Sequence, residues 1–200
     1  MVATVPNTTP YEGDLVVQRY EDPQGHAAGV LAPGGTILRT DVNGSFVEML
    51  AGGVRNPYDF TFTNDGEMFT SDADMEWDIG SPWYRPTRML HVTAGGEYGW
   101  RSGWATWPAY YIDSLPATVD TGPGSPTGMA YYDHTAYPAR LQNSVFVADW
   151  AQGHIDAIKL VRDGATFKAK VTPFLKGRPL SVTALEIGPE GARSFPTAGR

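Results

Sequence analysis

The sequence predicts an all-β protein, an incomplete β-propeller of about two to three four-stranded antiparallel blades. Short runs rich in aromatic and β-branched residues alternate with glycine-containing turns, as in consecutive hairpins. These hairpins recur as imperfect repeats that begin near Asn56, Ser125 and Val182. The 23 Gly and 16 Pro among 200 residues favour turns over long helices. Because propellers close with about four to eight blades, the chain is expected to be part of a ring, or to complete one with another chain.

The clearest hairpin lies in the segment from Gly53 to Asp78. Residues 58–62 alternate and are rich in aromatic side chains, which predicts a strand. Asn64-Asp65-Gly66 predicts a tight turn, and residues 68–70 return as a second strand. A hairpin places the start of its first strand and the end of its second at one edge. The polar residues that flank both strands should therefore share one rim: Arg55, Asn56, Asp72 and Asp74.

The rest of the chain follows the same pattern. Residues 1–35 are predicted to be an irregular N-terminal segment, and residues 36–200 a partial propeller domain. Complete blades are expected over 36–100 and 124–176, separated by a long loop with many aromatic residues. A hairpin over 184–197 follows.

The same hairpin argument brings Asp149 and Trp150 to the rim. Asp72, Asp74 and Asp149, with nearby carbonyl groups, form a candidate site for a hard cation, and calcium accepts such irregular sets of oxygen ligands. The acidic run is not an EF-hand, because its glycine and bidentate glutamate positions do not fit. The alternative is that these carboxylates cap the ends of blade loops.

Composition excludes several classes of partner. A net charge of -7 without a basic stripe argues against binding to nucleic acid. No run of about 18 apolar residues is present, so no membrane span is expected. The first ten residues lack the layout of a signal peptide, and the chain contains no Cys. The expected partner is a small-molecule substrate, together with further blades or a second copy that covers the open strand edges as a homo-oligomer.

Several phrases resemble one known family. They are GVRNPYDFTFTNDGEMFTSDADMEWD, GGEYGW, and GSPTGMAYY followed by SVFVADWAQG. The chain resembles the soluble quinoprotein glucose/sorbosone dehydrogenases, closest to their bacterial dehydrogenase-like branch. The resemblance implies a six-bladed propeller that uses pyrroloquinoline quinone and calcium. It also implies a periplasmic or secreted protein.

The resemblance assigns roles to some residues of this sequence, whereas at other positions the sequence lacks the residue that the family has. Arg55 and Asn56 match the pair that contacts the quinone oxygens, and Ser71 to Met75 match a segment that supplies calcium ligands. The cofactor-binding lysine of the family falls at Ala151. Two family arginines fall at Ser181 and Thr183, and the catalytic histidine belongs to blades that this sequence does not contain.

Three functions stay open from the sequence. In a quinoprotein oxidoreductase acting on a sugar-like alcohol or aldose, Arg55, Asn56 and Trp150 would bind the cofactor. In a calcium-dependent hydrolase such as a lactonase, Asp72, Asp74 and Asp149 would bind the metal that activates water. Arg55, Asn56 and Asp149 are the catalytic candidates across these two functions. The third possibility is a non-catalytic binding protein that uses the aromatic loop at 101–111.

Overall fold

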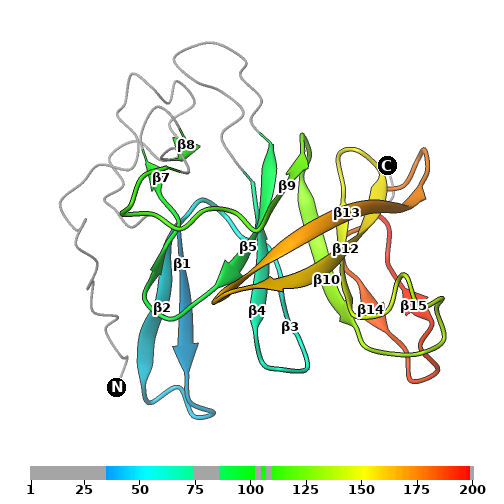
Figure 1. Cartoon of the computed structure of the whole chain (residues 1–200). Coiled ribbons are helices and arrows are strands. Elements are labelled where there is room, and N and C mark those ends of the chain that lie inside the picture. Colours follow the sequence, from blue (N-terminus) through cyan, green and yellow to red (C-terminus); the bar gives the residue numbers. More distant parts are fainter. Residues whose placement is uncertain (1–34, 74–85, 102–104, 107–109, 199–200) are drawn as a thin grey trace. The chain divides into compact units, whose positions relative to one another are not determined.

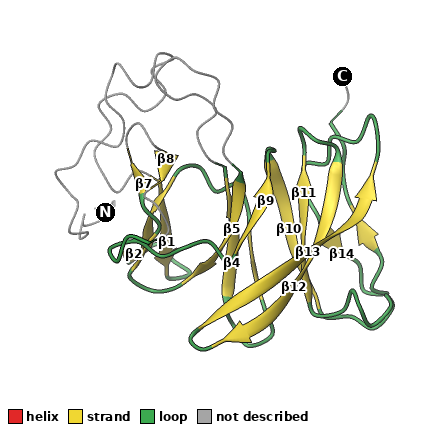
Figure 2. Ribbon diagram, turned by 45° about the horizontal axis from the view of Figure 1, so that its top comes forward, coloured by secondary structure: helices red, strands yellow, loops and turns green. Residues whose placement is uncertain are grey.

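The structure is a computed structural model of the chain, and it describes residues 35–73, 86–101, 105–106 and 110–198. Those residues form fifteen β-strands without an α-helix (Figures 1 and 2). No helix among them is therefore long and apolar enough to cross a membrane. The chain divides into two compact units. The predicted all-β class is confirmed.

The second unit comprises residues 57–73, 86–91 and 117–200, and it contains two four-stranded sheets. Within each sheet the strands lie in chain order, which is the topology of a propeller blade. The first blade contains β3 (Phe60–Phe62), β4 (Met68–Asp72), β5 (Thr87–Val92) and β9 (Val119–Gly122). The second blade contains β10 (Pro126–Tyr132), β11 (Ser144–Asp149), β12 (His154–Asp163) and β13 (Thr166–Lys176).

The turn between β3 and β4 forms where the Asn-Asp-Gly sequence predicts it. Gly66 has a φ of 82°, a value that glycine adopts without steric cost, and its N–H donates to the Thr63 carbonyl at 2.9 Å. The turn brings Phe60 opposite Thr70 and Phe62 opposite Met68. The local sequence thus determines both the turn and the register of this hairpin.

The two blades pack against each other through a shared apolar core. Phe69 and Met89 of the first blade meet residues from three strands of the second. The buried members on the second blade are Met129, Val145, Val147 and Ile158. The innermost strands are also joined by a hydrogen bond, since the Tyr131 N–H of β10 donates to the Thr61 hydroxyl of β3 at 2.9 Å, and the Met129 N–H donates to an Asp59 carboxylate oxygen just before β3 at 2.8 Å. Apolar burial and strand-to-strand polar contacts therefore align the two blades together.

A third sheet begins on the far face of the second blade. It has two strands, β14 (Glu186–Ile187) and β15 (Arg193–Ser194), as the sequence predicts for the last hairpin. Val182 and Leu185 pack into a core with Ala130 and Phe146 of the second blade. Gly128 permits this approach, since a Cβ there would lie 2.5 Å from the backbone of Ala184.

Arg193 of β15 enters this core as a cation. Its guanidinium carbon lies 3.4 Å from the centroid of the Phe146 ring and 4.9 Å from that of Tyr132. All three side-chain nitrogens are buried and have no hydrogen-bond partner among the described residues. Burial lowers the pKa of Arg193 to about 10. Among the described residues, the cation–π contacts with these two rings therefore offset part of the free-energy cost of removing the Arg193 charge from water.

Glu67, at the end of the first blade opposite the candidate rim, joins the two blades by polar contacts. One carboxylate oxygen lies 2.9 Å from His91 Nε2, and the other accepts from Arg162 of β12 at 2.8 Å. His91 Nδ1 lies 3.2 Å from the Thr166 hydroxyl, and its ring stacks on Phe69. The hydrogen bonds from Arg162 and His91 lower the pKa of Glu67 below its ordinary 4.5.

Replacing Glu67 by glutamine is expected to lower the free energy of unfolding at neutral pH by about 1 kcal/mol, since both contacts lose their charge and one of them is exposed. The pKa of Glu67 is depressed in the folded state, so its contribution is full above the ordinary carboxyl pKa. It is lost as the pH falls through the folded value. Urea unfolding of wild type and Glu67→Gln should therefore differ at pH 7 and converge below pH 4.5. Glu186→Gln, an exposed change, serves as the control, and a difference that persists at low pH would contradict this account.

The first unit comprises residues 1–56, 74–85 and 92–116. Its described part contains a three-stranded sheet in which β1 (Gly35–Thr40) pairs antiparallel with β2 (Val47–Val54), and β2 pairs parallel with β6 (Gly96–Glu97). A separate short ladder joins β7 (Trp100–Arg101) and β8 (Ala105–Thr106). The hairpin expected after residue 36 is confirmed.

One predicted blade boundary is wrong. The sequence predicts a complete blade over residues 36–100, whereas the first complete blade runs from Phe60 to Gly122. Its outer strand, β9, lies in the segment expected to be an aromatic loop, and pairs with β5 across the insertion between them. The β1–β2 hairpin instead belongs to the sheet with β6. The second predicted blade, 124–176, agrees with β10–β13.

Candidate functional site

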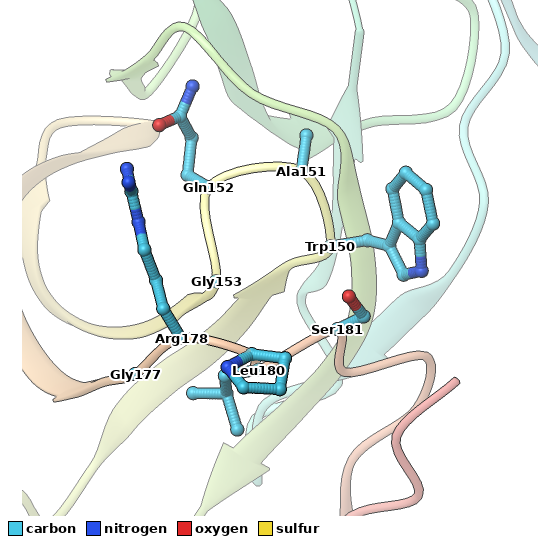
Figure 3. Close-up of a pocket in the computed structure, with 9 residues that line it drawn as sticks. Trp150, Ala151, Gln152, Gly153, Gly177, Arg178, Leu180 and Ser181 are labelled. Atoms are coloured by element: carbon cyan, nitrogen blue, oxygen red, sulfur yellow. The ribbon is translucent and has the colours of Figure 1, made fainter. Parts of the chain in front are cut away.

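A pocket lies in the second unit between the β11–β12 turn and the loop that follows β13. Its volume is about 510 Å³, and it is lined by residues 150–153 and 177–181 (Figure 3). The Gly177 N–H donates to the Gly153 carbonyl at 3.0 Å, which joins the two walls. The hairpin argument predicts polar residues at this edge of the blade, and the pocket is found there.

The pocket lining combines one cation with aromatic and amide groups. Figure 3 shows Gln152 and Arg178 extending to the same side, whereas Trp150 extends to the other. Trp150 is 39% exposed, so part of its indole is available to a ligand. Of the residues that line this pocket, Arg178 is the cationic one, and Ser181 adds a hydroxyl. Such a lining suits a small planar molecule that carries a negative charge.

Asp149 holds the turn that carries these residues. Its side chain is buried, and its Oδ2 accepts from the Ser125 N–H at 2.8 Å while Oδ1 accepts from the Gln152 N–H at 2.7 Å. Both carboxylate oxygens are thus bonded to backbone donors. This geometry is that of a capping carboxylate, the alternative that the sequence left open, and it gives Asp149 a positioning role.

Asp72 ends β4 and is fully buried. Its Oδ2 lies 3.2 Å from a guanidinium nitrogen of Arg88 on β5, whose side chain is 9% exposed. The pair neutralises two buried charges within the first blade. The sequence pattern predicts Asp72 as a calcium ligand but does not indicate its contact with Arg88. The assignment of Asp72 as a calcium ligand stays a prediction.

The other sequence candidates are distributed over the chain. Arg55 and Asn56 belong to the first unit, where an Arg55 guanidinium nitrogen lies 3.5 Å from the Asn56 side-chain oxygen. Asp72, Asp149 and Trp150 belong to the second unit. Asp74 lies outside the described residues. Among the residues that are described, no three acidic or histidine side chains group closely enough to hold a metal ion. The catalytic and metal-binding assignments therefore stay predictions.

A second polar group lies at the start of β12, close to the turn. His154 Nε2 lies 3.3 Å from Asp156 Oδ2. Burial raises the pKa of Asp156 above its ordinary 3.8, His154 opposes that change, and the charge of Asp149 adds to it. The carboxylates of Asp149 and Asp156 therefore lie close enough to influence each other, whereas the charged group that lines the pocket is Arg178.

Sequence reasoning missed Arg178. The signal was present, because Gly177-Arg178-Pro179 directly follows the outer strand of the second blade and so falls at the same rim as residues 150–153. The family resemblance instead places an arginine at the position of Ser181, a residue that lines the same pocket but carries no charge.

Comparison with solved structures identifies the class of fold. The chain is 18% identical to an oxidoreductase of Thermus thermophilus described as a glucose dehydrogenase, with a TM-score of 0.59 over 74% of this chain. It is 18% identical to the PQQ-bound aldose sugar dehydrogenase of Streptomyces coelicolor, with a TM-score of 0.55 over 76% of this chain. A further glucose dehydrogenase gives a TM-score of 0.65 at 16% identity over 80% of this chain.

These similarities establish a shared fold. The protein has the propeller fold of the soluble sugar dehydrogenases, as the sequence resemblance implies. The chain spans 41%, 42% and 51% of the length of these three structures, so it corresponds to about half of such a propeller. No family model and no curated protein matches the sequence.

Proposed function

We propose that this chain is part of a propeller oxidoreductase of the quinoprotein sugar dehydrogenase type, acting on a sugar-like alcohol or aldose. The observation that carries the proposal is the shared fold with several structures described as sugar dehydrogenases. The pocket at the β11–β12 turn supports it, since Arg178, Gln152, Ser181 and Trp150 line a cavity large enough for part of a small molecule. Fold alone does not determine function, so the pocket is the part that an experiment must test.

The pocket fits one end of a quinone such as the PQQ of the Streptomyces enzyme. A guanidinium pairs with a carboxylate through two parallel hydrogen bonds, and Arg178 provides that group. The exposed part of Trp150 provides an aromatic surface, and Gln152 provides an amide. When bound, the quinone supplies the hydride acceptor. Ala151 and Ser181 add no charge. The pocket lining therefore offers one cation, Arg178, to a ligand with several negative charges.

Replacing Arg178 by glutamine is expected to weaken binding of pyrroloquinoline quinone about ten- to a hundredfold, the usual effect of losing hydrogen bonds to a charged group. Titration followed by quinone absorbance and tryptophan fluorescence measures the affinity. Arg140→Gln is the matched control, because Arg140 is exposed in the β10–β11 loop away from the pocket. Equal affinities of wild type and Arg178→Gln would exclude Arg178 from the site. Wild-type protein that neither binds quinone nor reduces a dye with glucose, in the presence of calcium, would reject the oxidoreductase proposal.

Two alternatives stay predictions. A calcium-dependent lactonase requires hydrolysis that a chelator abolishes, and lactone turnover that survives chelation would count against it. The binding function assigned to the aromatic loop depends partly on residues outside those described. In its described part, Tyr110 and Tyr111 stack at 5.5 Å and are 85% and 45% exposed. Turnover by the purified chain would rule out a purely non-catalytic function.

A further inference from the structure

The lysines of this chain all lie on one pair of strands. The sequence contains four of them, Lys159 on β12 and Lys168, Lys170 and Lys176 on β13. Residues 159–178 carry six Lys or Arg against one Asp, whereas the whole chain carries 15 Lys and Arg against 22 Asp and Glu. The two outer strands of the second blade are therefore locally cationic on a protein whose net charge is -7.

Strand pairing gathers three of these lysines on one face of the blade. Lys159 lies directly opposite Lys170, and Val161 lies opposite Lys168. The alternate residues of β13 face the other way and pack against the core shared with the first blade: Phe167, Ala169 and Val171. Val161 is 60% exposed, so solvent reaches the surface between the lysines. Lys159, Lys168 and Lys170 together form a lysine face, which exists only when β12 and β13 pair.

The described part of the chain leaves the lysine face mostly uncompensated. Lys168 Nζ lies 3.0 Å from an Asp163 carboxylate oxygen, but the two side chains are 77% and 50% exposed, so this ion pair contributes little. Lys159 Nζ donates to the Gln142 carbonyl, and Lys170 is in none of the ion pairs among the described residues. Like charges directly opposite each other destabilise paired strands. The pairing of Lys159 with Lys170 therefore favours a bound anion.

The strand that carries two of these lysines also has an open edge. β13 is 11 residues long, and among the described strands it pairs with β12 alone. Alternate residues of an edge strand direct their backbone N–H and C=O groups away from the sheet, where another strand can pair with them. Pairing of two copies of β13 would bring their lysines together, and like-charge repulsion opposes that contact. An acidic strand would meet the same lysines with opposite charge.

We propose that β13 is a docking edge for an extended acidic segment of a partner protein, which adds a fifth strand to the second blade. Backbone hydrogen bonds to β13 supply part of the affinity, and Asp or Glu side chains of the segment meet Lys168 and Lys170. Because side chains alternate between the two faces of a strand, the acidic residues occupy every second position of the segment. The inference is independent of the sugar dehydrogenase proposal, since no residue of the lysine face lines the pocket.

The probe that tests the proposal is a fluorophore-labelled octapeptide of alternating Glu and Thr with both ends blocked, and its binding is followed by anisotropy. Saturable binding is expected, and Lys168→Gln/Lys170→Gln should weaken it about tenfold, since exposed ion pairs contribute up to about fivefold each. Arg39→Gln is the matched control, because Arg39 is an exposed cation of the first unit. Bound peptide should also protect Lys168 and Lys170 from acetylation by an amine-reactive reagent.

Two further peptides, N-methylated at every Glu or at every Thr, separate strand addition from simple charge attraction. A strand directs only alternate N–H groups to its neighbour, so one of these peptides should lose binding and the other should keep it. Binding of both at the affinity of the parent peptide would overturn the proposal. So would a heparin fragment that binds as tightly as the peptide, or the absence of binding at about 1 mM peptide.

Discussion

Replacing Arg88 by methionine is expected to lower the free energy of unfolding by about 3–5 kcal/mol, because the buried Asp72 carboxylate loses its counter-charge. The pair lies inside the first blade, with Asp72 fully buried and Arg88 nearly so. The double variant Asp72→Leu/Arg88→Met should recover most of this loss, since both charges are then removed together. Urea unfolding of the two single variants and the double variant gives the coupling energy.

Arg39→Met provides the matched control for this change. Arg39 also pairs with a carboxylate across strands, that of Glu48, but its side chain is 64% exposed, so the expected loss is below about 1 kcal/mol. The same series tests Asp72 as a calcium ligand. If calcium stabilises Arg88→Met far more than wild type, the metal binds at Asp72 in that variant and the ion pair alone does not explain the role of Asp72. A loss at Arg88 no larger than at Arg39 would contradict the prediction.

Replacing Asp149 by asparagine is expected to cost about 2–3 kcal/mol of folding free energy. The Ser125 and Gln152 N–H groups donate to different carboxylate oxygens, so in asparagine one of these two donors would face the side-chain NH2, which cannot accept from it. Because the turn from Trp150 to Gly153 lines the pocket, ligand affinity should fall together with stability. Thermal unfolding and quinone titration on the same samples measure the two effects.

Asp133→Asn, an exposed change in the β10–β11 loop, is the control and should alter stability by less than about 0.5 kcal/mol. The result separates two roles for Asp149. A positioning residue loses stability and affinity together, whereas a catalytic residue would lose turnover at unchanged stability. The latter outcome would restore the catalytic assignment made from the sequence.

Much of the fold could be predicted because turn sequences determine hairpins locally. Asn64-Asp65-Gly66 specifies the turn and the register of β3–β4. The alternation of residues 58–62 did not show which side chains are buried, since Phe60 and Phe62 are about half exposed and every residue of β4 is buried. The error at the first blade has a different origin. β9 joins β5 across a long insertion, and β6 joins β2 in parallel, and neither contact has a local sequence signal.

The candidate site was predictable only in its location. Spacing placed Asp149 at a rim but did not show that both its oxygens face backbone N–H groups, because that depends on the path of residues 124 and 125. Spacing likewise could not show Arg88 beside Asp72, since the two residues lie on different strands. Arg178 could have been found by applying the hairpin argument to the end of the last long strand.

Burial of the Arg193 charge affects which part of the second unit unfolds first. A guanidinium held between Phe146 and Tyr132 occupies space that an aliphatic side chain would fill at no electrostatic cost. We therefore expect the contact between the second blade and its terminal hairpin to be weaker than the contact between the two blades, where the buried core is apolar and the polar groups are hydrogen-bonded. As denaturant rises, amide hydrogens of the terminal hairpin should exchange with solvent well before those of β11 and β12.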